Sequence, residues 1–161
     1  MAGCCKAAHA IHPLIPSNQL ANYWAWKSRL AQKMVDAAVA KARELGVSEN
    51  VAILDDGGNL KAFSRMDGAS IPTIEIAQKK AYTALFGVST QDFFDFIKGD
   101  PSLLAGIPTL ARVAAWGGGL PIKVNGEVVG AIGLSGAPTV QNDVDCAKAA
   151  LALVSDSVAS N

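Results

Sequence analysis

The chain has 161 residues, half of them hydrophobic and 17% charged, and its formal net charge is zero. This length predicts one domain with a fair-sized core, and the zero net charge argues against a nucleic-acid-binding protein. No apolar run reaches the roughly 18 residues of a membrane span, and we expect no signal peptide. The chain has three cysteines, two of them adjacent, which do not make a disulfide framework. We therefore expect a cytoplasmic protein.

Residues 1–16, MAGCCKAAHAIHPLIP, have no sustained hydrophobic period, and we predict that they form an N-terminal arm. The arm holds Cys4, Cys5 and both histidines of the chain, His9 and His12. Their spacing fits no common zinc pattern, so we predict no metal site there. The remaining residues, 17–161, are predicted to form a single domain.

Residues 20–45 carry apolar side chains at helical spacing. Ser17 is placed to cap this helix and Gly46 to end it. The pattern leaves open whether this is one long helix or two helices with a break near Ser28.

Two short strands are expected next, as a hairpin. Residues 51–54 are typical of a buried strand, residues 55–59 of a turn, and residues 60–66 of the returning strand. Asp55 and Asp56 precede glycines in this turn, where structural aspartates are common.

Two helices then follow the hairpin. The first is predicted over residues 72–86, with Ser70 as its cap and Pro72 in its first turn. The second is predicted over residues 91–97, with Thr90 as its cap. Within the first helix, Glu75 and Lys79 are spaced for an i,i+4 ion pair.

Residues 117–138, GGGLPIKVNGEVVGAIGLSGAP, predict a second hairpin. Asn125-Gly126 is the strongest turn signal in the chain, because both central positions of a type I′ turn need positive φ. A two-residue loop predicts three pairs: Val124 with Glu127, Ile122 with Val129, and Leu120 with Ala131. Both faces of this hairpin are apolar, so helices, a ligand or another subunit must cover them.

The ends of this second hairpin complete the domain. Residues 112–116 either begin a further strand or lead into the hairpin, and Thr139 is placed to cap a last helix. Strands that come in hairpins between helices predict an α+β fold with an antiparallel sheet. The mean hydropathy of +0.26 indicates surplus apolar surface, which predicts an oligomer.

Polar residues gather where the first hairpin meets the next helix. Arg65 and Asp67 beside a helix N-terminus favour an anionic ligand. Lys80 lies two turns into that helix. The structural alternative for Arg65 is an ion pair with Asp67 or with Asp143.

The glycine run 117–119 could place backbone N–H groups against a ligand, and Gly118 and Gly119 are therefore candidate binding residues. The alternative is a strand bulge.

The chain resembles the GlcG/HbpS-like proteins, also called DUF336 or the haem-degrading domain, which also form the C-terminal half of PduO. The matching stretches run from about Leu30 to Val154 and are LAQKMVDAAVAKARELG, VAILDDGGNLKAFSRMDGA, EIAQKKAYTALFG and GGGLPIKVNGEVVGAIGLSGAPTVQNDVDCAKAAL. The resemblance implies a profilin-like sandwich, with a five-stranded antiparallel sheet flanked by helices on both sides. It also implies homo-oligomers, from dimers to octamers, and haem or corrinoid binding, often at a subunit interface.

Haem binding raises the question of an axial ligand, which is usually His, Cys, Met or Tyr. The matching region contains no histidine, so His9 or His12, from a neighbouring chain, is the first choice. The other candidates within the match are Met34, Met66, Tyr82, Cys146 and Thr83.

The alternative is an enzyme that needs no cofactor and uses the same pocket. An isomerase or cyclase, for instance in secondary metabolism, would work on an apolar small molecule. The predicted polar residues of that pocket are Arg65, Asp67, Lys80, Glu75 and Tyr82, with Asp67 as the base and Lys80 or Tyr82 as the acid. A non-catalytic assembly module is a third interpretation.

Overall fold

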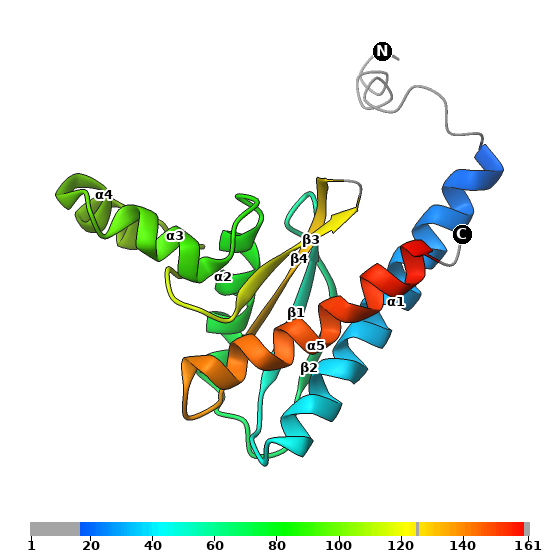
Figure 1. Ribbon diagram of the computed structural model, residues 1–161, viewed down its shortest axis with the longest axis horizontal. Helices are drawn as coiled ribbons and strands as arrows, with labels where there is room; N and C mark the ends of the chain where they lie inside the picture. Colours follow the sequence, from blue (N-terminus) through cyan, green and yellow to red (C-terminus); the bar gives the residue numbers. More distant parts are fainter. Residues whose placement is uncertain (1–16, 125, 160–161) are drawn as a thin grey trace, which may run out of the picture.

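A four-stranded antiparallel sheet lies between helices (Figure 1). The computed structural model describes residues 17–124 and 126–159, with side-chain surroundings for 28–124 and 126–154. The strands are β1 (Asn50–Asp55), β2 (Leu60–Arg65), β3 (Gly119–Val124) and β4 (Glu127–Ser135), in the order β2-β1-β4-β3. The helices are α1 (Ser17–Glu44), α2 (Thr73–Ala84), α3 (Thr90–Ile97), α4 (Pro101–Gly106) and α5 (Val140–Ala159), with a 3-10 turn, η1 (Ile107–Thr109).

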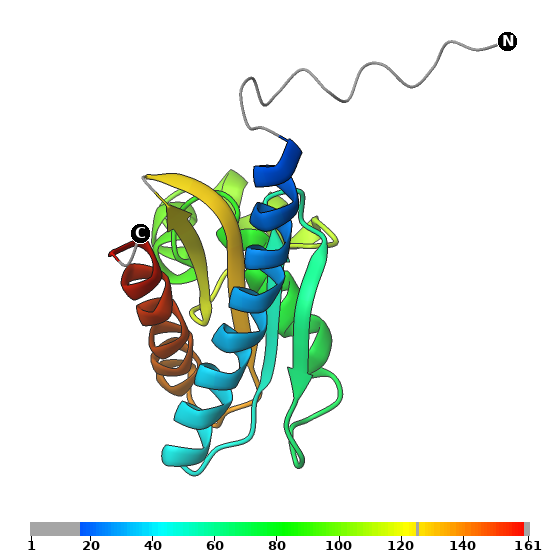
Figure 2. The ribbon, with the colours of Figure 1, turned by 90° about the vertical axis from the view of Figure 1, so that its right-hand side faces the viewer.

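Helices α1 and α5 pack side by side on one face of the sheet, and α2 packs on the other (Figures 1 and 2). The core between the sheet and the α1–α5 pair is apolar, and its central side chains are fully buried: Met34, Val35, Val51, Ile132, Leu134 and Cys146. Helices α3 and α4 extend away from the sheet (Figure 1). None of the helices in the part of the chain that the structure describes is long and apolar enough to cross a bilayer.

A row of residues with little or no side chain lets α2 approach the sheet closely. Gly133 on β4 pairs with Gly119 on β3 and with Ala52 on β1. A Cβ atom on Gly133 would lie 2.1 Å from the carbonyl oxygen of Ala77 on α2. On Gly119 it would lie 2.4 Å from the carbonyl oxygen of Lys80. The helix therefore rests on strand backbone, which fixes the position of Lys80.

The expected α+β fold with an antiparallel sheet is confirmed, but the described residues form four strands rather than five. The segment 112–116, predicted either to begin a further strand or to lead into the second hairpin, is irregular and leads into β3. Its backbone is held by a helix, because the N–H of Ala114 donates to Thr83 Oγ1 on α2 at 2.9 Å.

The predicted register of the second hairpin is correct only next to the turn. Val124 pairs with Glu127 as expected, but a bulge between Ile122 and Lys123 shifts the rest by one residue. Ile122 therefore pairs with Gly130 and Leu120 with Ile132. The shift places Ile122 and Ile132 together in the α1–α5 core.

Most helix ends lie near their predicted positions. Residues 17–44 form one continuous helix, without a break near Ser28. Ser89, rather than Thr90, caps α3 by accepting the N–H of Asp92, and no side chain caps α2. Thr139 Oγ1 accepts the N–H of Asn142, as expected of a cap for α5.

Candidate functional site

The two residues predicted to hold an anion lie on the surface at the end of β2. Arg65 Nη1 donates to the carbonyl of Ala69 at 3.4 Å, and the backbone carbonyl of Asp67 accepts from Ser48 Oγ at 2.9 Å. Both side chains are exposed. The proposed ion pair of Arg65 with Asp143 is wrong, because Asp143 pairs with another cation.

Glu75 and Tyr82 do not share a site with these residues. Glu75 is exposed and forms the predicted ion pair with Lys79, at 2.8 Å. Tyr82 packs beside the β1–β2 turn, where the guanidinium of Arg112 lies 3.8 Å from the centre of its ring. The geometry therefore separates the acid–base set that the sequence suggests.

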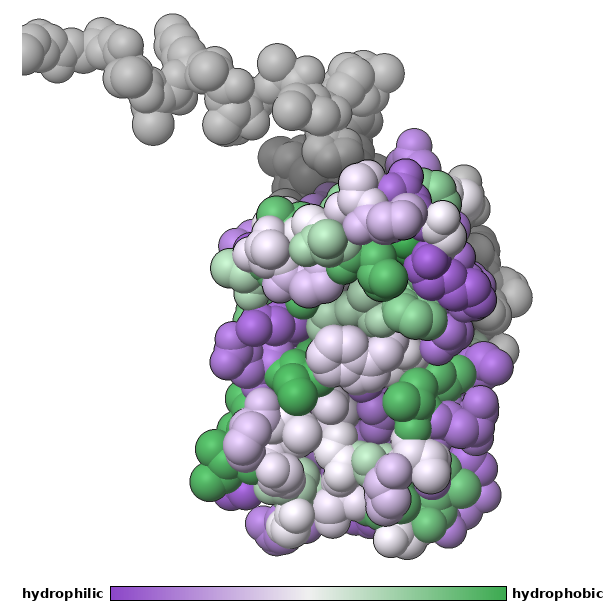
Figure 3. Space-filling view, turned by 90° about the vertical axis from the view of Figure 1, so that its left-hand side faces the viewer, coloured by the Kyte–Doolittle hydropathy of each residue, from purple (hydrophilic) through white to green (hydrophobic). Residues whose placement is uncertain are grey.

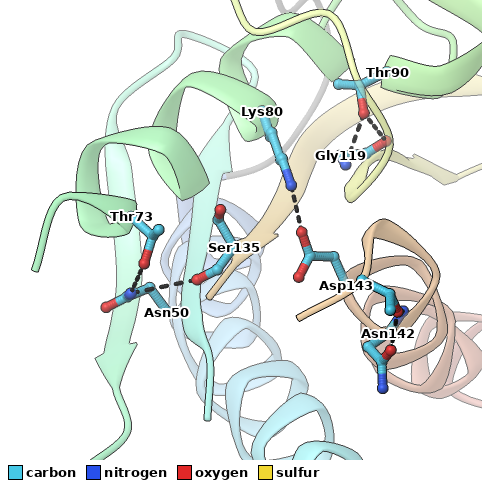
Figure 4. A network of polar contacts seen from close by, with 9 residues as sticks. Asn50, Thr73, Lys80, Thr90, Gly119, Ser135, Asn142 and Asp143 are labelled. Carbon is cyan, nitrogen blue, oxygen red and sulfur yellow. Dashed lines mark hydrogen bonds and ion pairs between the residues drawn. The ribbon is translucent and has the colours of Figure 1, made fainter. Parts of the chain in front are cut away.

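Three of the predicted cofactor-binding residues hold the fold together. The sulfur of Met66 accepts the N–H of Glu49 at 3.4 Å. Thr83 is buried and bonds the backbone on both sides, donating to Lys79 and accepting from Ala114. The N–H of Gly119 donates to Thr90 Oγ1 at 2.9 Å (Figure 4).

Lys80 lies at the centre of a buried polar cluster. Its ammonium donates to Asp143 Oδ2 at 2.5 Å, which joins α2 to the first turn of α5 (Figure 4). The side chains of Lys80 and Asp143 are 1% and 5% exposed. An ion pair removed from water this fully is costly to break, because either partner alone would be a bare buried charge.

Glu49 is the third member of the cluster and enters it from the residue before β1. It is fully buried, and neither of its carboxylate oxygens has a hydrogen-bond donor among the described residues. Burial, and after it the nearby carboxyl of Asp143, raise the pKa of Glu49 to about 8, against smaller lowering effects of Lys80 and of the Ala137 backbone. Glu49 is therefore a neutral acid at pH 7.

A glycine loop closes over this cluster. A Cβ atom on Gly118, whose φ is +117°, would lie 2.8 Å from Lys80 Nζ and 2.9 Å from Asp143 Cβ. Trp116, one of the exposed aromatic residues, has its ring centroid 5.8 Å from Lys80 Nζ. In the part of the chain that the structure describes, no three His, Cys, Asp or Glu side chains gather as metal ligands.

The helical periodicity of the sequence could have predicted two members of this cluster, whereas no single motif does. Lys80 shares the buried stripe of α2 with Ala77 and Ala84. Asp143 precedes Cys146 and Ala147 by three and four residues, so it lies on the buried stripe of α5. A charged residue on a buried stripe needs a partner of opposite charge. Glu49 carries no such signal in the sequence.

A small apolar cavity lies at the other end of the sheet, between α1 and the strands. Its volume is about 40 Å³, and Asp55 and Lys61 stand among its otherwise apolar walls. The apolar walls are Leu30, Ala31, Met34, Ile53, Leu54, Ile122, Val124 and Val129. The strand residues that line the cavity lie near the two hairpin turns. These turns are at the end of the sheet where α1 begins (Figure 2).

Haem iron is usually held by a His, Cys, Met or Tyr side chain, and the described residues offer few that are available. Cys146 is buried, and burial raises the pKa of its thiol to about 12. The ring of Tyr82 stacks against the guanidinium of Arg112, and the sulfur of Met66 accepts a hydrogen bond from the backbone N–H of Glu49. That leaves the thioether of Met34 in the cavity wall, while His9 and His12 lie outside the described residues. Met34 is itself buried, and a cavity of about 40 Å³ is too small to enclose a haem, so the described residues of one chain do not form a complete haem site.

A family model described as haem degrading protein HbpS-like matches residues 27–152. Among curated proteins, an uncharacterised 15.0 kDa protein from the dhaT–dhaS intergenic region of Citrobacter freundii is 38% identical over 123 residues, covering 75% of this chain and 86% of that protein. Protein GlcG of Escherichia coli K12 is 34% identical over 111 residues, covering 66% and 81%.

Solved structures share the fold. The crystal structure of a PduOC:heme complex has a TM-score of 0.72 and 31% identity, covering 77% of this chain and 91% of that one. The crystal structure of HbpS has a TM-score of 0.76 and 25% identity, covering 94% and 98%. These matches span most of the described residues.

Proposed function

The chain belongs to the HbpS-like family, and on that premise we propose that it binds haem or a related tetrapyrrole at the cavity between α1 and the sheet. The observation that carries the proposal is the relative crystallised with haem, which shares 31% of its sequence and the same fold. The apolar walls of the cavity suit a flat hydrophobic ligand.

The proposed axial ligand is His9 or His12, because a histidine is the usual ligand of haem iron and the chain has these two. Both residues precede α1, whose residues Leu30, Ala31 and Met34 line the cavity. Met34 is the proposed second ligand from this chain. A bound haem would supply redox-active iron, and the protein would supply ligation and an apolar wall.

The cavity is much smaller than a haem, so the ligand must be covered from another side. We propose that a second subunit provides this cover in a homo-oligomer, in the range from dimer to octamer. The side of the molecule that carries α3 and α4, away from α1 and the cavity, also has hydrophobic residues on its surface, among hydrophilic ones (Figure 3), which supports self-association but not the cover of the ligand itself. They include Phe86, Phe96 and Leu104, which are 61%, 71% and 44% exposed.

The test is absorbance in the Soret region after hemin is added to the full chain and to three variants. We expect the His9→Ala, His12→Ala double variant to lose the band, and Met34→Leu to shift it. Met66→Leu is the matched control, because Met66 does not line the cavity and its sulfur accepts a hydrogen bond from the backbone N–H of Glu49. An unchanged band in the double histidine variant would refute the assignment of the ligand.

A haem-independent enzyme, of the isomerase or cyclase kind, is the second candidate. The observation that favours it is the buried pair of Lys80 with Asp143, beside a neutral acid. Of the acid–base residues suggested by the sequence, Lys80 alone belongs to this cluster, so the second candidate is built on it rather than on Asp67. Stable protein that shows no specific Soret band would favour this function over haem binding.

A further inference from the structure

Three ionisable side chains meet in the interior at the end of the sheet opposite the haem cavity. Lys80 comes from α2, Asp143 from α5, and Glu49 from the residue before β1. All three are at least nine-tenths buried. Two carboxyl groups face one ammonium, so full ionisation would leave one uncompensated negative charge in a dry site.

The hydrogen-bonding atoms of the cluster show the same imbalance. Lys80 satisfies one oxygen of Asp143, but Asp143 Oδ1 and both oxygens of Glu49 have no donor among the described residues. A proton on Glu49 corrects this, because a protonated carboxyl can donate to Asp143 Oδ1. One added proton thus balances both the charge and the hydrogen bonds.

The other titratable groups near the cluster do not supply a second cation. Cys146 on α5 is a neutral thiol, and Lys41 on α1 is paired with Glu44 at 2.7 Å. Asp145 on α5 adds negative charge near Cys146 and accepts a hydrogen bond from Gln141. The loop contributes the ring of Trp116 and the glycine backbone, neither of which is charged.

We propose that Glu49 and Asp143 share one proton, that Lys80 neutralises the remaining carboxylate, and that Trp116 and the glycine loop close this proton-sharing cluster from solvent. The site lies at the far end of the sheet from the haem cavity and does not depend on haem binding. With the shared proton its total charge is zero, which is the charge that a dry interior tolerates best.

The first test is infrared spectroscopy of the full chain near pH 6.5, where exposed carboxyls with pKa values of about 4 are ionised. We expect the carbonyl stretch of a protonated carboxyl in the wild type and its loss in Glu49→Gln. Glu75→Gln is the matched control, because Glu75 is 74% exposed and paired with Lys79, and it should keep the band. A wild type without the band, or Glu49→Gln that retains it, would overturn the proposal.

A second measurement uses the wild type alone, so it does not depend on whether a variant folds. Isotope-labelled glutamate in the wild type allows the carboxyl of each glutamate to be titrated by NMR. We expect one glutamate to titrate several pH units above the others, and titration of all of them in the ordinary acidic range would contradict the shared proton.

The role of Trp116 as a cover is tested by deuterium exchange of the same infrared band. In Trp116→Ala the protonated carboxyl should exchange with deuterated water faster than in the wild type. Phe96→Ala is the control, since it removes an aromatic residue of α3 that is 71% exposed. Equal exchange rates in Trp116→Ala and the wild type would refute the assignment of Trp116 as the cover.

Discussion

Replacing Glu49 by Gln should flatten the dependence of stability on pH. In the folded chain the pKa of Glu49 is raised from 4.5 to about 8, so between these values the folded state holds a proton that the unfolded state has lost. The free energy of unfolding then falls as pH rises, and this contribution is complete below pH 4.5 and gone above about pH 8. The amide of Gln does not titrate in this range, so the Glu49→Gln variant lacks this pH-dependent contribution to stability.

The size of the effect follows from the linkage between proton binding and folding. One proton contributes up to about 1.4 kcal/mol per pH unit inside this window. From pH 5 to pH 8 the wild type should therefore lose up to about 4 kcal/mol relative to Glu49→Gln. The amide of Gln can still donate to Asp143, so the variant should fold.

The assay is urea unfolding followed by circular dichroism at four pH values between 5 and 8. Protein concentration is held constant, because an oligomer gains stability with concentration. Glu75→Gln should keep the slope of the wild type, since Glu75 is exposed and pairs with Lys79. Parallel curves for the wild type and Glu49→Gln would refute the buried neutral acid.

Three further predictions test the packing around the cluster. Lys80→Met should lower the free energy of unfolding by about 3–5 kcal/mol, because it leaves Asp143 buried without a cation. Lys79→Met, which removes the exposed ion pair with Glu75, should lower it by under about 1 kcal/mol. Equal losses for the two variants in urea titrations would contradict the buried pair. Gly133→Ala should displace α2 and lower the melting temperature strongly, because the new Cβ would meet the Ala77 carbonyl, while Gly99→Ala, which has open space, should change it little. With the other two cysteines changed to serine, Cys146 should resist thiol reagents at pH 8 until urea is added, because it is buried and its pKa is about 12; rapid labelling of the folded chain would disprove this.

The sequence predicts the elements well where one residue type decides the local geometry. Asn125-Gly126 gives the position of the second hairpin, and Gly46, with a φ of +69°, ends α1. The bulge after Ile122 could not be predicted, because both Val129, the expected partner, and Gly130, the observed one, can stand opposite Ile122 in an antiparallel pair. The close contact of α2 with Gly119 and Gly133 could not be predicted either, because pairing between strands that are distant in the sequence brings these glycines together under the helix.

The candidate site was less predictable than the fold. Lys80 stands out in the sequence, but Asp143 lies 63 residues away and contacts it only because α2 and α5 reach the same end of the sheet. Glu49 directly precedes a strand, and charged residues are mostly exposed, so its burial beside Asp143 and Lys80 depends on tertiary structure that the local sequence does not show. Arg65 and Asp67 are adjacent to a helix start in the sequence, yet the fold leaves both side chains exposed.

The central claim is that this HbpS-like chain binds haem, and a hemin titration of the full chain tests it most directly. Absorbance and the mass of the assembly would be measured on the same sample. The account predicts a saturable Soret band at one haem per chain or per dimer, on a stable oligomer. Absorbance that rises with hemin without saturating, on a stable oligomer, would contradict it.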